Sequence, residues 1–103
     1  MTLCLEGDLD LDSISRFRDR AFTAIGERPG VLLLDLSRVP FVDTAGLAAL
    51  VTVARVARMV SVGVGVIPAP HLRRVLHLTG LTRLLPITDA SVLDGPADAE
   101  KKT

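Results

Sequence analysis

The stretch VLLLDLSRVPFVDTAGLAALV, residues 31–51, holds the pattern that decides the fold. Its first six residues form an almost continuous apolar run, which is typical of a central strand covered on most sides. An Ala/Leu/Val-rich segment follows over about residues 44–60 and favours a helix. Asp43 is a preferred N-cap residue. The stretch therefore predicts a strand, a short turn and a helix, with one hydroxyl, that of Thr44, at the join.

Three shorter runs outside this stretch also have strand character. They cover residues 2–6, 62–67 and 84–87. The glycines of the run VGVGVI lie inside a strand pattern, so close backbone packing explains them better than a nucleotide-binding loop. The single cysteine, Cys4, lies in the apolar run LCL and is expected to be a small buried hydrophobe.

Two more helices are expected between these strands. One follows Ser13, a candidate N-cap, and the other begins near Pro70 and ends at Gly80, a natural C-cap. The apolar face of the first consists of Ile14, Phe17, Ala21, Ala24 and Ile25. These residues recur at helical spacing, so this helix is predicted to bury one face in the core.

The alternation of strands and helices predicts a single α/β domain over residues 1–93. We expect a small mixed four-stranded sheet with helices packed on it. Residues 94–103 are rich in Asp, Pro, Gly and Lys and are expected to form a disordered tail.

Composition argues against several classes of function. Twelve basic residues balance twelve acidic ones, so no overall field attracts nucleic acid or an anionic membrane. Trp and Tyr are absent, which removes the usual base-stacking side chains. No secretion signal and no apolar run of about 20 residues is present, so a cytoplasmic protein is expected.

Catalysis and metal binding are also disfavoured. Thr44 has only Asp43 as an acidic neighbour and no histidine that the sequence places beside it, so we expect no enzyme activity. His71 and His77 are six residues apart, which is not a metal-binding spacing on one helix. No cofactor is expected. The carboxylates of the acidic turn, Asp10 among them, fall just before a helix, where they favour its dipole.

The DTAG join itself invites a functional reading. Ala45 and Gly46 are small, so another surface could approach the Thr44 hydroxyl closely. The helix after the join is apolar on two sides, with Ala49 and Val53 nearly opposite its expected core face. That second strip either packs against flanking helices or forms an exposed docking strip, and the sequence leaves both possibilities open.

Taken together, the chain resembles a STAS domain, the family of bacterial anti-sigma factor antagonists and the cytosolic tails of sulphate transporters. The acidic turn LEGDLDLDS is similar to the family's acidic turn, and DLSRVPFVDTAGLAALV to its signature strand, turn and helix. HLRRVLHLTGLTRLLPI is similar to its last helix and strand. Family members usually begin with an additional strand that this chain has no residues for. The sheet is therefore expected either to have an exposed edge or to pair with a partner there, and the oligomeric state stays open.

In the antagonists, the residue after the Asp of the D-S/T-x-G signature is phosphorylated by the partner. That partner is at once an anti-sigma factor and a serine/threonine kinase with a histidine-kinase-like ATPase domain. The resemblance implies that the unmodified chain binds this partner and that phosphorylation of Thr44 ends the binding. The partner-binding residues carried over in this way are Asp10, Asp43, Thr44, Ala45, Gly46 and Leu47.

A second function of a different class is open. Some short STAS proteins resemble this chain equally well and act as regulatory subunits on the ATPase of an ABC phospholipid transporter. In these proteins the Thr of the same join lies at the contact, so both functions need an exposed hydroxyl. The intact D-T-x-G-L pattern and the acidic turn favour the antagonist.

Overall fold

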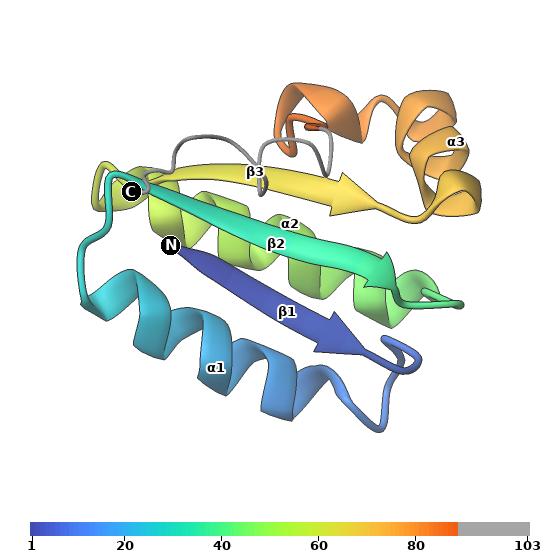
Figure 1. Ribbon diagram of the computed structural model, residues 1–103, viewed down its shortest axis with the longest axis horizontal. Coiled ribbons are helices and arrows are strands. Elements are labelled where there is room, and N and C mark those ends of the chain that lie inside the picture. Colours follow the sequence, from blue (N-terminus) through green and yellow to red (C-terminus); the bar gives the residue numbers. More distant parts are fainter. Residues whose placement is uncertain (89–103) are drawn as a thin grey trace.

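The computed structural model describes residues 1–88, so the domain boundary at 93 and the tail over 94–103 lie outside the described residues. Strands and helices alternate along this part of the chain as expected, and a helix begins at Thr44 (Figure 1). In order, the elements are β1 (Thr2–Glu6), α1 (Ile14–Gly26), β2 (Val31–Arg38), α2 (Thr44–Met59), β3 (Gly63–Pro68), α3 (Pro70–Thr79) and the 3-10 helix η1 (Leu81–Arg83).

The strands within residues 1–88 form one sheet in the order β1-β2-β3, and both pairs of neighbours are parallel. Leu33 of β2 lies opposite Thr2 on one side and Gly65 on the other. The expected α/β class is therefore correct, but the expected mixed, four-stranded sheet is wrong. Because all three strands are parallel, their carboxyl ends meet at one edge of the sheet.

The run 84–87 does not form the fourth strand. It contributes a single bridge between Ile87 and Val66, in which the Val66 amide donates to the Pro86 carbonyl at 2.8 Å. Two features limit the pairing. The amide of Leu85 is still bonded to the turn of η1, and Pro86 has no N–H to extend a ladder.

One face of the sheet is covered by α1 and α2, which lie side by side (Figure 1). β2 contributes Leu32, Leu34 and Leu36 to the core between sheet and helices, and all three are fully buried. Phe17 and Ala21 of α1 are buried in the same core, as the spacing predicts. Since burying one leucine side chain contributes roughly 1.5–3 kcal/mol, this layer is the main support of the fold.

The second apolar strip of α2 packs inside the domain. Ala49 and Val53 are buried, and Val56 and Val60 are half-buried against the core. The helix contacts both α1 and β3, so two of its sides need apolar residues. The alternative of an exposed docking strip on α2 is therefore wrong.

Cys4 is exposed, which corrects the expectation of a buried thiol. Successive side chains of a strand point to opposite faces, so Leu3 and Leu5 face the core while Cys4 points to the other side. No helix of the described chain covers that side of β1 (Figure 1). The Cys4 thiol lies 3.9 Å from a carboxylate oxygen of Asp35 on the neighbouring strand.

This exposure predicts that the native protein reacts with a thiol reagent such as 5,5′-dithiobis(2-nitrobenzoate) without denaturant. One equivalent of thiol per chain should be titrated at the same final level with and without urea. The Cys4→Ser variant, as the control, should give no signal. A thiol that becomes reactive only after unfolding would show that this face of β1 is covered in solution.

Candidate functional site

The acidic turn after β1 and the loop after β2 are joined by their backbones at the carboxyl edge of the sheet. The Leu9 amide donates to the Phe41 carbonyl at 2.9 Å, and the Asp43 amide donates to the Leu9 carbonyl at 3.2 Å. These bonds form an isolated parallel bridge between Leu9 and Val42. The two segments that the sequence singles out, the acidic turn and the DTAG join, are therefore brought together.

Asp43 caps α2 as predicted. Its carboxylate accepts a hydrogen bond of 2.8 Å from the Gly46 amide, and its own backbone is extended. Thr44 is the first residue of the helix and its side chain is exposed. Its hydroxyl makes no hydrogen bond to any residue of the described chain. The join therefore presents a free hydroxyl at the positive end of a helix dipole.

The structural role of Gly46 differs from the expected one, which was to let an outside surface approach Thr44. It is buried, and a Cβ built on it would collide with the Leu9 carbonyl oxygen and lie 2.9 Å from Cγ1 of Val42. The glycine is thus needed so that the acidic turn can approach α2.

Asp10 stabilises the acidic turn at the start of α1. One of its carboxylate oxygens accepts from the amides of Asp12 (3.1 Å) and Ser13 (3.2 Å), so Asp10 caps the turn that leads into α1. Ser13, the expected cap, has no capping bond of its own. Its hydroxyl donates to the Asp8 carbonyl at 2.8 Å and accepts from the Asp10 amide at 3.0 Å, which ties the acidic turn together.

Two exposed apolar side chains on these same segments were missed by the sequence reasoning. Leu11 in the acidic turn is 72% exposed, and Phe41 in the loop before the join is 53% exposed. Ala45 and Leu47, in the first turn of α2, are half-buried. The sequence could have indicated the exposure of Leu11 and Phe41, since a leucine between acidic residues and a phenylalanine after a proline both lie outside the helix and strand patterns.

Within residues 1–88, no three side chains of the metal-binding types cluster. His71 and His77 lie exposed on α3. No hydrogen bond joins the Thr44 hydroxyl to another residue of the described chain. Nor does any helix described here combine the length and apolar character needed to span a bilayer.

These features define a small parallel α/β domain that presents a hydroxyl at the carboxyl edge of its sheet. A family model described as "Mlab, STAS domain" matches residues 1–86. The chain belongs to the STAS domain family. A comparison with curated proteins found no match.

Solved structures give the same result. An anti-sigma factor antagonist from Mycobacterium paratuberculosis is similar with 26% identity and a TM-score of 0.77, over 90% of this chain and 79% of that one. The anti-sigma factor antagonist SpoIIAA of Bacillus, in its phosphorylated form, is 22% identical with a TM-score of 0.63, over 98% and 87% of the two chains. The STAS domain of a SulP transporter from Vibrio cholerae is 23% identical with a TM-score of 0.73, over 98% and 82%. The chain thus resembles anti-sigma factor antagonists. The likeness to SpoIIAA and to the SulP domain, at 22% and 23% identity, shows the fold alone.

The packing of Gly46 predicts that Gly46→Ala destabilises the domain by about 1–3 kcal/mol, because the methyl group has no room beside Leu9 and Val42. Urea unfolding followed by far-UV circular dichroism measures this change. Gly26→Ala is the matched control, since Gly26 also lies in a helix but its Cβ meets nothing within 4 Å. Equal midpoints for wild type and Gly46→Ala would contradict the close approach of the acidic turn.

Proposed function

We propose that this STAS domain is a cytoplasmic anti-sigma factor antagonist that binds a serine/threonine-kinase anti-sigma factor and is released by phosphorylation of Thr44. The protein is not itself an enzyme in this proposal. The partner transfers the γ-phosphoryl group of ATP to the Thr44 oxygen, with loss of the hydroxyl proton and release of ADP. One observation carries the proposal, namely the exposed and unbonded Thr44 hydroxyl at the start of α2.

The surroundings of Thr44 support a docking surface at this edge. Leu11 and Phe41 are exposed apolar side chains on the two segments that the Leu9 bridge holds together. Asp10 and Asp43 add carboxylates on the same segments. A rigid surface with apolar anchors and polar neighbours is typical of specific protein contacts. Asp43 and Gly46 contribute mainly by holding the join in shape.

The proposed switch also agrees with simple energetics. A phosphothreonine at a helix N-terminus is favoured by the dipole by only about 0.3–1 kcal/mol, so the fold should change little. A dianion trapped under a docked partner without a matching cation costs roughly 2–5 kcal/mol, which is about 30-fold to several-thousand-fold in affinity. The same modification is mild for the domain and severe for the complex.

A second candidate is a STAS regulatory subunit bound to the ATPase of an ABC phospholipid transporter. The matching family model supports keeping it, because that model is described by the name Mlab and not as an antagonist. This function would use the Thr44 hydroxyl as an unmodified contact. The two candidates therefore differ in what binds and in whether Thr44 is modified.

Thr44 variants test the proposal. Thr44→Ala should fold normally, bind the partner and accept no phosphate, whereas Thr44→Glu should keep the far-UV circular dichroism of wild type and bind at least tenfold more weakly. Side-by-side pull-downs from native cytosol with wild type and Thr44→Glu identify the partner by mass spectrometry. Its affinity is then measured with purified proteins, and any tryptophan fluorescence comes from the partner because this chain has none.

The outcomes separate the two candidates. The antagonist is supported if a histidine-kinase-like ATPase binds wild type but not Thr44→Glu. The same ATPase should phosphorylate wild type but not Thr44→Ala. Recovery of an ABC-transporter ATPase with no phosphate on Thr44 supports the transporter subunit. Equal phosphorylation of wild type and Thr44→Ala would show that another residue is modified.

The exposed apolar pair gives a separate prediction. Leu11→Ala and Phe41→Ala should each weaken partner binding about tenfold or more while leaving the unfolding midpoint within experimental error, because both side chains are exposed in the free domain. Leu78→Ala on α3 is the control, since Leu78 is 78% exposed but lies on a different element. Isothermal titration with the purified partner measures the effect. Unchanged affinity for both Leu11→Ala and Phe41→Ala would place the contact elsewhere.

A further inference from the structure

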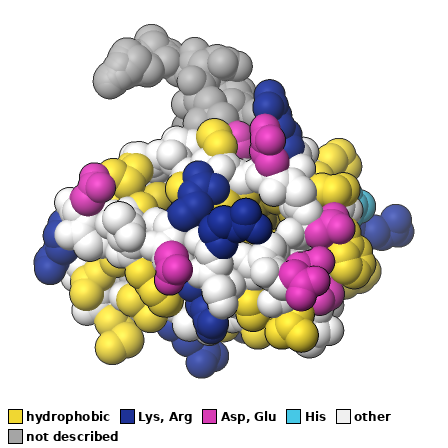
Figure 2. Space-filling view, turned by 90° about the horizontal axis from the view of Figure 1, so that it is seen from below, with side chains coloured by type: hydrophobic (Ala, Val, Ile, Leu, Met, Phe, Trp, Pro, Cys, Tyr) yellow, Lys and Arg dark blue, Asp and Glu magenta, His cyan; other side chains and the backbone are white. Residues whose placement is uncertain are grey.

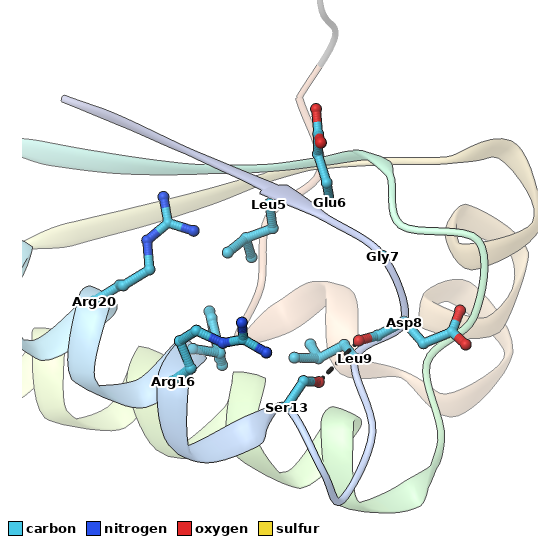
Figure 3. Close-up of a pocket in the computed structure, with 9 residues that line it drawn as sticks. Leu5, Glu6, Gly7, Asp8, Leu9, Ser13, Arg16 and Arg20 are labelled. Atoms are coloured by element: carbon cyan, nitrogen blue, oxygen red, sulfur yellow. Dashed lines mark hydrogen bonds between the residues drawn. The ribbon is translucent and has the colours of Figure 1, made fainter.

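A second polar feature lies on the other side of the acidic turn from the DTAG join. It is a cavity of about 260 Å³ between the end of β1, the acidic turn and the first turns of α1 (Figure 3). None of residues 43–47 lines it. Its apolar floor is built by Leu5, Leu9 and Phe17, which are all buried.

Two arginines of α1 reach this cavity. Arg16 and Arg20 are four residues apart and so lie on the same side of the helix, and both guanidinium groups extend toward β1 and the turn (Figure 3). Arg20 donates one hydrogen bond of 3.1 Å to the Cys4 carbonyl. Arg16 makes no hydrogen bond or ion pair with any residue of the described chain.

Neither arginine forms an ion pair with a carboxylate of the described chain. The acidic residues at the rim are Glu6 and Asp8. Glu6 is engaged by Arg38 at 3.0 Å, and the Asp8 side chain points away from the cavity (Figure 3). Seen from the α1 side, basic side chains gather near the middle of this face beside a hollow, with acidic side chains around them (Figure 2). The two cations of the cavity are thus not held in ion pairs within the described chain.

We propose that the Arg16–Arg20 cavity is a binding site for a small phosphate-class oxyanion. Guanidinium groups offer planar pairs of donors that match phosphate oxygens, and charge-assisted bonds of this kind are the stronger ones. The cavity of about 260 Å³ has room for one phosphate group.

The phosphate group can come from free inorganic phosphate or from a small phosphomonoester. The site requires neither the partner protein nor modification of Thr44, so it goes beyond the proposed function and can fail or hold independently of it. Its position on the acidic turn would let a bound anion influence the segment that carries Leu11.

The test is an NMR titration of the full-length ¹⁵N-labelled chain with sodium phosphate, in which sodium chloride is withdrawn to keep ionic strength and pH constant. Saturable shifts are expected for the Gly7 and Leu9 amides and for the Arg16 side-chain Nε–H. A parallel titration with glycerol 3-phosphate distinguishes the sources. Tighter binding of the ester indicates a phosphomonoester, and equal binding indicates that the phosphate group alone is recognised.

Variants make the assignment specific. Arg16→Ala should weaken phosphate binding at least tenfold, and Arg16→Lys should restore part of it because the charge returns without the planar fork. Arg18→Ala removes the same charge from α1 at a position that does not line the cavity, and should change binding less than twofold. Arg16 has no described bond to lose, so its variants should remain folded. Shifts that do not saturate, or equal binding by wild type and Arg16→Ala, would overturn the proposal.

Discussion

The peptide group of Leu9 is the constraint on which the rest of the site depends. Its amide is bonded to the Phe41 carbonyl, and its carbonyl is bonded to the Asp43 amide and lies against Gly46. β1 and β2 are parallel, so the chain leaves both strands at the same edge and the acidic turn must lie beside the loop into α2. A side chain at Gly46 would separate the two segments. The geometry of the edge is therefore a direct result of parallel pairing plus one glycine.

This constraint also explains why a single hydroxyl is left for outside contacts. The Asp43 carboxylate is occupied by the helix cap, one Asp10 oxygen caps the turn into α1, and the Ser13 hydroxyl is bonded to the turn. Thr44 is the polar side chain of the join that serves no described partner. Changes at Thr44 can thus act on binding with little effect on folding, whereas changes at Asp43 affect both.

The sequence predicted local features better than spatial ones. Helical spacing correctly placed Phe17 and Ala21 in the core, and cap chemistry correctly placed the start of α2 at Thr44. The fourth strand failed because the η1 turn and Pro86 interrupt the run, which composition alone does not reveal. Cys4 was misplaced because an apolar run does not show which face of a strand is covered. The true role of Gly46 depends on a contact 37 positions away, with Leu9, that no local pattern contains.

The direction of the proposed switch rests on the apolar flanks of Thr44 more than on its charges. Residues 1–43 hold eight acidic and five basic side chains, so this part of the chain is net negative. A partner that docks there could carry basic groups. Basic groups alone would attract a phosphate. Leu11 and Phe41 are exposed on the segments around Thr44, however, and a partner that covers them must be apolar at those positions. In the proposed complex, a phosphate between apolar contacts would lose its water without gaining a cation, and this loss would favour release of the partner.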